Sequence, residues 1–122
     1  MATNYYLHHI PTEKDRDPFI KNIHIGKAST GWEFTFKENK NYYSSSYNDL
    51  MEFMSNAIAS GYWNLIDEYG TKITFNEFRN IIKRHIGGWN YITYERDHPN
   101  TFYAGEDYLS KDGTWWCKAD FC

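Results

Sequence analysis

Residues 23–36 read Ile-His-Ile-Gly-Lys-Ala-Ser-Thr-Gly-Trp-Glu-Phe-Thr-Phe, and this stretch decides the fold. Apolar and polar residues alternate on both sides of a segment rich in Gly, Ser and Thr, which predicts a β-hairpin with one buried face. The expected buried set is Ile23, Ile25, Trp32, Phe34 and Phe36. The expected solvent-facing set is His24, Lys27, Glu33 and Thr35. We expect the rest of the chain to cover the apolar face.

Length and composition bound the class of protein. The chain has 122 residues, enough to bury a core of its own, and we expect residues 1–122 to form a single domain. Aromatic residues make up 20% of the sequence, more than a small core buries easily. Some of them therefore lie half-exposed on a sheet or contact a partner or a flat ligand. The formal net charge is −3 with no basic block, which argues against duplex nucleic acid as a partner.

The same composition gives an expectation for the compartment. No apolar run approaches the roughly 18 residues of a membrane helix, and the start of the sequence has no signal-peptide pattern. The two cysteines, Cys117 and Cys122, are too few for a disulfide framework. We therefore expect a cytoplasmic protein with no membrane partner.

Two helices are predicted on the C-terminal side of the hairpin. Ser45 or Ser46 is suited to cap a helix over residues 47–60, and Gly61 is suited to end it. The sequence Thr-Phe-Asn-Glu at 74–77 matches a capping box and begins a second helix that extends to about residue 85. Each helix carries apolar residues at helical spacing, so each should pack one face on a sheet.

The remaining strands are predicted from alternation and turn residues. We expect strands over residues 4–9, 62–66, 89–95 and 114–121, with residues 72–73 pairing back onto 62–66 and a loop over 104–113. With the hairpin, the order is β-β-β-α-β-α-β-β. This order predicts an α+β fold in which two helices pack on one face of a mostly antiparallel sheet.

The sequence offers little for metal or covalent chemistry. The residues with metal-ligating atoms that we considered are His8, His9, His24, His98, Cys117 and Cys122. The Cys117–Cys122 spacing has no matching second pair, so we predict a buried thiol and a terminal thiol rather than a zinc site. No signature marks Cys117 as a nucleophile, and no carboxylate pair is placed for acid–base catalysis. We therefore predict no metal, no cofactor and no catalytic residues.

Two segments are candidates for binding an anionic ligand. The turn at residues 26–31 has the composition of a phosphate loop, but its order is wrong and a strand follows it, so an ordinary tight hairpin is the alternative. Its backbone amides and polar side chains can nevertheless hold one anionic group. The second helix carries a basic side with aromatic residues beyond it, which would hold a nucleotide by charge and stacking. The alternative there is a solvated helix face. The predicted ligand-binding residues are Lys27, Ser29, Thr30, Trp32, Arg79, Lys83, Arg84, Trp89 and Tyr91.

Several of these motifs occur together in one group of proteins. The pattern Ile-His-Ile-Gly-Lys-x-Ser-x-Gly-Trp-x-Phe, the Asp-Glu-Tyr-Gly turn at 67–70, the N-terminal Tyr-Tyr and an aromatic C-terminal strand resemble small uncharacterised bacteriophage and prophage proteins. The resemblance spans most of the chain and implies a viral accessory gene. Many of those proteins carry a Cys-x-x-Cys-like knuckle before the hairpin. Residues 8–22 here contain no cysteine, so a zinc knuckle is not carried over.

The resemblance implies no activity, and small phage accessory proteins often act by binding. We expect an anti-defence protein that sequesters a nucleotide-derived signal, with its pocket at an interface of a homo-oligomer. The alternative is an inhibitor that occludes a host defence protein, in the manner of an anti-CRISPR protein, through exposed tyrosines and tryptophans. A small enzyme or a metal-binding module is a weaker alternative because no catalytic set emerges.

Overall fold

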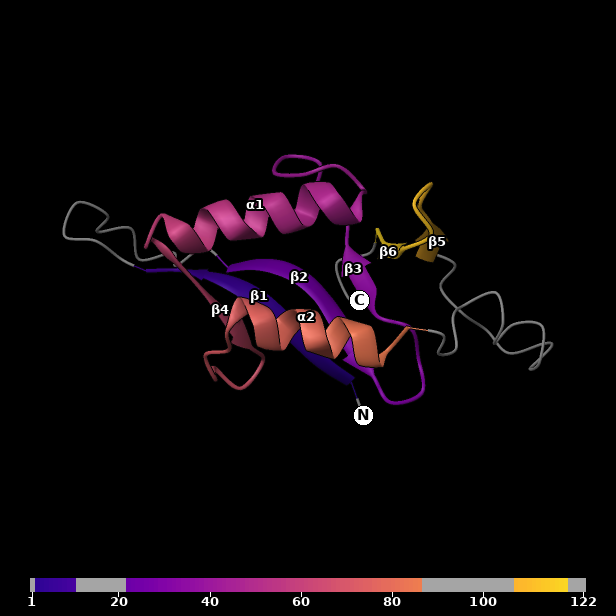
Figure 1. Cartoon of the computed structure of the whole chain (residues 1–122), viewed down its shortest axis with the longest axis horizontal. Coiled ribbons are helices and arrows are strands. Elements are labelled where there is room, and N and C mark those ends of the chain that lie inside the picture. The colour runs from indigo at the N-terminus through magenta and orange to yellow at the C-terminus, as the bar shows by residue number, and fades with distance from the viewer. Residues whose placement is uncertain (1, 11–21, 87–106, 119–122) are drawn as a thin grey trace.

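The computed structural model describes residues 2–10, 22–86 and 107–118, and within them six strands form one sheet (Figure 1). The strands are β1 (Ala2–His9), β2 (Asn22–Ser29), β3 (Thr35–Lys37), β4 (Trp63–Asp67), β5 (Asp107–Leu109) and β6 (Trp115–Cys117). Their order in the sheet is β4-β1-β2-β3-β6-β5. β3 and β6 run parallel, whereas the other neighbours in this sheet run antiparallel.

Two helices lie side by side on the same face of the sheet, as Figure 1 shows. They are α1 (Tyr47–Ala59) and α2 (Phe75–Arg84). The Ser46 hydroxyl accepts a hydrogen bond from the Asp49 amide, and the Thr74 hydroxyl accepts one from the Glu77 amide, so the predicted caps of both helices are confirmed. Gly61 follows α1 with a φ of +80°, a left-handed conformation that favours glycine at a helix end.

The core lies between the sheet and the two helices. Leu50 and Met54 of α1 and Phe78 of α2 are fully buried against the sheet. Around Phe78, the rings of Tyr5 and Phe34 lie with centroids 5.4 and 5.5 Å from its own. The predicted α+β architecture, with two helices on one face of a mostly antiparallel sheet, is confirmed. No helix in the described ranges is long and apolar enough to cross a membrane.

A β-bulge interrupts the pairing of β1 with β2. Tyr5 pairs with Gly26 and Tyr6 pairs with His24, so Ile25 is an extra residue in β2. Ile25 is nevertheless fully buried in the core cluster. The extra residue changes the alternation of β2, so that His24 and Lys27, three positions apart, lie on the same face of the sheet.

Gly26 is required at this bulge because there is no space for a side chain. A Cβ atom added there would lie 2.5 Å from the Thr35 carbonyl oxygen and 2.7 Å from Cε1 of Phe34. The Phe34 ring instead packs over the bare backbone of β2, where it contacts Phe36 and Phe78. The close approach of Phe34 to Gly26 therefore joins the two strands of the hairpin.

The structure corrects parts of the predicted hairpin and C-terminal region. Trp32 is only half-buried, and Thr35, predicted to face solvent, is 8% exposed because it lies between β2 and β6. The segment 104–113, predicted as a loop, contains β5, and the last strand is shorter than predicted. The predicted strand at 89–95 lies outside the described residues.

Asp112 attaches the turn between β5 and β6 to the start of α1. Its Oδ2 accepts a hydrogen bond of 2.7 Å from the Tyr47 amide, at the positive end of the helix dipole. Its Oδ1 accepts from the Ser110 hydroxyl at 2.8 Å and from the Thr114 amide at 3.1 Å. Burial alone would raise the pKa of this carboxyl, but the bonds from Thr114, Tyr47 and Ser110 lower it to about 2.

We predict that Gly26→Ala lowers the free energy of unfolding by roughly 1–3 kcal/mol, because one methyl group must displace backbone and a packed ring. Chemical denaturation of both proteins measures the difference. Gly70→Ala is the comparison, since Gly70 has a φ of +83° and nothing within 4 Å of an added Cβ, so its loss reports backbone strain without a clash. Gly26 is not among the glycines with a positive φ, so its loss reports the clash, and a loss of less than about 1 kcal/mol for Gly26→Ala would contradict the assigned contact.

We predict that Asp112→Asn destabilises the protein at neutral pH and has no effect near pH 2. The folded-state pKa of about 2 lies below the ordinary 3.8, so the carboxylate contributes stability above about pH 4, which is lost as the pH falls toward 2. Denaturation at a series of pH values, with Glu52→Gln as an exposed control on α1, measures this. A difference between wild type and Asp112→Asn that does not depend on pH would contradict the assignment.

Candidate ligand-binding face

The helices leave the opposite face of the sheet uncovered in the described part of the chain, and we call this the outer face. Its residues are Asn4, Tyr6 and His8 of β1, Asn22, His24 and Lys27 of β2, Lys37 of β3, and Asn64 and Ile66 of β4. Toward β6 the same face is closed, because Thr35, Trp115 and Cys117 are 8%, 6% and 3% exposed. Within the described residues, the outer face is therefore partly exposed over β1 and β2 and buried where β3 meets β6.

A stacked pair of rings lies at the centre of the outer face. The Tyr6 and His24 rings, partners across β1 and β2, have centroids 4.9 Å apart and planes 26° apart. The Asn4 side-chain oxygen accepts a hydrogen bond of 3.0 Å from Nε2 of His24. One step along the strands, the Asn22 side-chain oxygen accepts one of 2.7 Å from Nδ1 of His8. These bonds fix the orientation of both imidazoles.

Two lysines place positive charge beside this pair. Burial lowers the pKa of His24, and the charges of Lys37 and Lys27 lower it further, against an opposing hydrogen bond to the Gly26 backbone. The strand pairing agrees with this, because Lys27 pairs with Asn4, whose side chain bonds His24, and Lys37 lies two residues from Thr35, the other partner of Lys27. None of the nine outer-face residues named above is acidic, whereas at the β6 edge of this face Asp107 of β5 pairs with Cys117. A carboxylate that reaches a strand of this part of the sheet is that of Glu68, which accepts a hydrogen bond from the Asn4 backbone amide.

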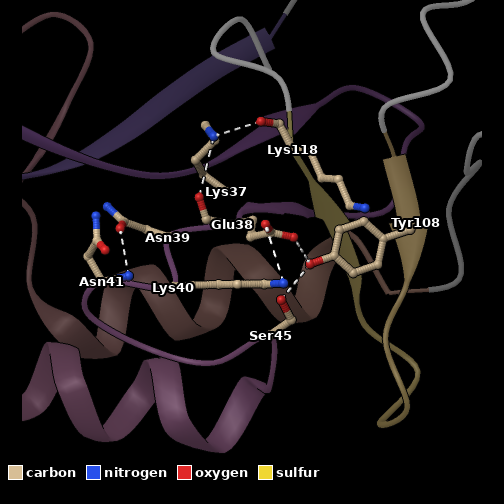
Figure 2. Close-up of polar contacts among 8 residues, drawn as sticks. All are labelled: Lys37, Glu38, Asn39, Lys40, Asn41, Ser45, Tyr108 and Lys118. Carbon is tan, nitrogen blue, oxygen red and sulfur yellow. Dashed lines mark hydrogen bonds and ion pairs between the residues drawn. The ribbon is translucent and has the colours of Figure 1, made fainter.

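Lys37 is held in place by the backbone. Its Nζ donates to the carbonyl oxygens of Glu38 and Lys118, at 3.4 and 3.3 Å. Figure 2 shows this ammonium apart from the Glu38 carboxylate, which is turned toward Tyr108 and Lys40. Because neither bond is to a carboxylate, the charge of Lys37 is not neutralised by these partners.

The remaining contacts in Figure 2 attach β5 to the segment before α1. The Tyr108 hydroxyl donates to Glu38, so the Ser45 hydroxyl, 2.5 Å away, must donate to Tyr108. The Lys118 ammonium lies 5.2 Å from the centre of the Tyr108 ring. Burial raises the pKa of Tyr108, as does its bond to Glu38. This network supports the β3–β6 side of the sheet, where Lys37 lies.

The predicted ligand-binding residues fall into two groups on opposite sides of the sheet. Lys27 and Ser29 belong to β2, and Thr30 lies in the turn that follows. The turn predicted over residues 26–31 therefore begins only at residue 30. Arg79, Lys83 and Arg84 are exposed on α2. The predictions for Trp89 and Tyr91 lie outside the described residues.

Trp32 connects the hairpin to the α2 side. Its carbonyl oxygen accepts a hydrogen bond of 2.9 Å from Nδ1 of His85. A cavity of about 510 Å³ lies there, lined by the core ring of Phe34 and by Glu33, Lys83, His85 and Asp112 among others. Two carboxylates, those of Glu33 and Asp112, line this cavity with Lys83, whereas the nine residues named for the outer face include two lysines and no acidic residue. For an anionic ligand the outer face is therefore better suited.

Sequence reasoning missed Tyr6, His24 and Lys37 as candidate ligand contacts. The sequence placed His24 on the solvent-facing side. Its ring partner is Tyr6 of β1, which lies 18 positions earlier in the sequence. The pairing of β1 with β2 is long-range, and the bulge changes its register. The alternation of Asn4, Tyr6 and His8 was the sequence signal for a polar face on β1. It does not show that β2 is the strand that pairs with β1.

The cysteine prediction requires a correction. Cys117 is buried in β6 as predicted, but it is disulfide-bonded rather than a free thiol. Within residues 2–10, 22–86 and 107–118, no three His, Cys, Asp or Glu side chains come together to hold a metal ion.

Comparisons with known proteins add no identity. No family model, no curated protein and no solved structure matches this chain. The resemblance to phage proteins therefore stays a prediction, and the functional argument depends on the geometry of the outer face.

We predict that Lys27→Met raises the pKa of His24, because the substitution removes a positive charge that disfavours the imidazolium. An NMR titration of the imidazole protons measures this directly. Lys83→Met, which removes the same charge from α2, serves as the control and should leave His24 unchanged. Equal effects of the two substitutions would mean that Lys27 does not lie beside His24.

Proposed function

We propose that this protein acts by binding, and that its ligand is a small anion with a planar ring held on the outer face. The observation that carries the proposal is the Tyr6–His24 ring pair beside Lys27 and Lys37, with no acidic residue among the nine named for the part of the face over β1 and β2. Aromatic side chains bind flat rings by stacking, and lysines bind phosphates and carboxylates by charge. A nucleotide has both features.

Electrostatics supports an anion at this position even though the whole chain is acidic. The two lysines that disfavour the positive charge of a protonated His24 favour a negative charge by the same interaction. The formal net charge of −3 opposes the approach of anions, so an anion gains most where lysines outnumber carboxylates. The nine residues named for the outer face, with two lysines and no acidic residue, meet this condition.

The resemblance to phage proteins supplies a biological setting for this proposal. A phage accessory protein that binds nucleotides without turning them over would remove a nucleotide-derived signal from the defence system of its host. Lys27 and Ser29 keep the role predicted for them from the sequence, and Tyr6, His24 and Lys37 join them.

The inhibitor alternative calls for a cluster of apolar anchors at the surface. Tyr62 and Tyr69, which are 53% and 70% exposed, are the large exposed side chains nearest to β4 in the sequence. They precede and follow β4 (Trp63–Asp67), a distance of roughly 15–20 Å at the rise of an extended strand. They therefore do not form one anchor cluster, and we favour ligand binding.

We predict that a nucleotide from a panel of cyclic nucleotides, ADP and ADP-ribose raises the melting temperature of the protein. A ligand at 100 times its Kd adds about 2.7 kcal/mol to the free energy of unfolding, an effect of several degrees for a domain of this size. Differential scanning fluorimetry measures the shift at increasing ligand concentration.

Two lysine substitutions show which side of the sheet binds. Lys27→Met should abolish most of the shift, and Lys83→Met should preserve it. The reverse result would move the site to the cavity beside α2. No shift with any member of the panel, together with co-purification of a host protein, would reject ligand binding in favour of the inhibitor alternative.

A further inference from the structure

The outer face has a direction, and we propose that it binds a nucleotide in one orientation, with the base on Tyr6 and His24 and the phosphates at Lys27 and Lys37. The proposal rests on the proposed function and adds the size and polarity of the ligand. It follows from how aromatic, amide and cationic side chains are distributed along the strands.

The part of the face formed by the middle of β1 and β2 is suited to a base. The ring pair supplies the stacking surface. The oxygens of Asn4 and Asn22 accept hydrogen bonds from His24 and His8, which leaves the NH₂ groups of both amides as donors. A nucleobase carries ring nitrogens and carbonyl oxygens that accept such bonds, so the amides are suited to contact the edge of a stacked base.

The part of the face toward β3 is suited to phosphate. Lys27 pairs across the sheet with Asn4 on one side and with Thr35 on the other, and Lys37 lies two residues beyond Thr35 on β3. The Lys37 ammonium has three N–H donors. Two of them donate to backbone carbonyl oxygens, which leaves one for a ligand. Two cations thus flank His24, Lys27 along β2 and Lys37 across the sheet on β3.

Spacing sets the size of the ligand. Because of the bulge, His24 and Lys27 are one same-face step apart, since their partners Tyr6 and Asn4 are two residues apart on β1. This step is about 7 Å along the strand at the rise of extended backbone. A sugar linking a base to its phosphate spans a gap of this order. The described face has one ring pair, whereas single-stranded nucleic acid binds through a succession of stacking side chains and a groove that follows its backbone. The ligand is therefore one nucleotide with one or two phosphates.

Isothermal titration calorimetry of the full chain with adenosine, inorganic pyrophosphate, ADP and a ten-residue oligodeoxyadenylate tests this orientation. ADP should bind more tightly than either fragment, and the oligonucleotide should bind no more tightly than ADP. Tyr6→Leu should weaken ADP at least about fivefold and leave pyrophosphate unchanged. Lys27→Met should weaken ADP and pyrophosphate by a similar factor, about tenfold, and leave adenosine unchanged.

Two controls separate loss of binding from loss of folding. Tyr6→Phe keeps the ring and should keep ADP affinity within about twofold, and Lys83→Met should match wild type with every probe. If Tyr6→Leu leaves ADP affinity unchanged while Lys27→Met lowers it, anion binding stands and the base position is wrong. If the oligonucleotide binds more tightly than ADP, the size is wrong. If no probe binds wild type, the proposed function itself fails.

Discussion

The contact between Gly26 and Phe34 is the constraint on which the rest of the structure depends. Because Gly26 has no Cβ, Phe34 can lie over the backbone of β2 and join the core ring cluster with Phe36 and Phe78. The extra residue beside it, Ile25, is buried as well. Two adjacent positions of one strand thus face the core, which strict alternation does not allow and a bulge does.

The bulge also determines the surface on the other side of the sheet. Without the extra residue, His24 and Lys27 would point to opposite faces, and the ring pair would have no cation along its own strand. With it, one local irregularity positions Phe34 for the core and Lys27 for a ligand. The two faces of the sheet therefore differ. The helices cover the apolar face, which forms the core, and the outer face carries polar rings, amides and lysines.

Local signals in the sequence predicted the elements well. The caps Ser46 and Thr74, the stop at Gly61 and the pairing of Lys72 with Ile66 were readable from neighbouring residues. The candidate site was only partly readable. Lys27 was identified, and the hairpin pattern placed its partner Thr35 on the same face, but Tyr6 and Asn4 come from β1, and pairing between distant strands leaves no signature in one sequence. For α2, helical spacing shows which basic residues are neighbours, but it does not show that they lie on the other side of the sheet from Lys27.

The most direct test of the account is a chemical-shift map of the isotope-labelled protein titrated with ADP. The account predicts concentration-dependent shifts at the ring of Tyr6, the imidazole of His24 and the side chain of Lys27. The resonances of Phe78 and Ile82, the buried residues of α2, should be unchanged. Shifts confined to Lys83, His85 and the cavity beside them would place the ligand on the other side of the sheet and contradict the account.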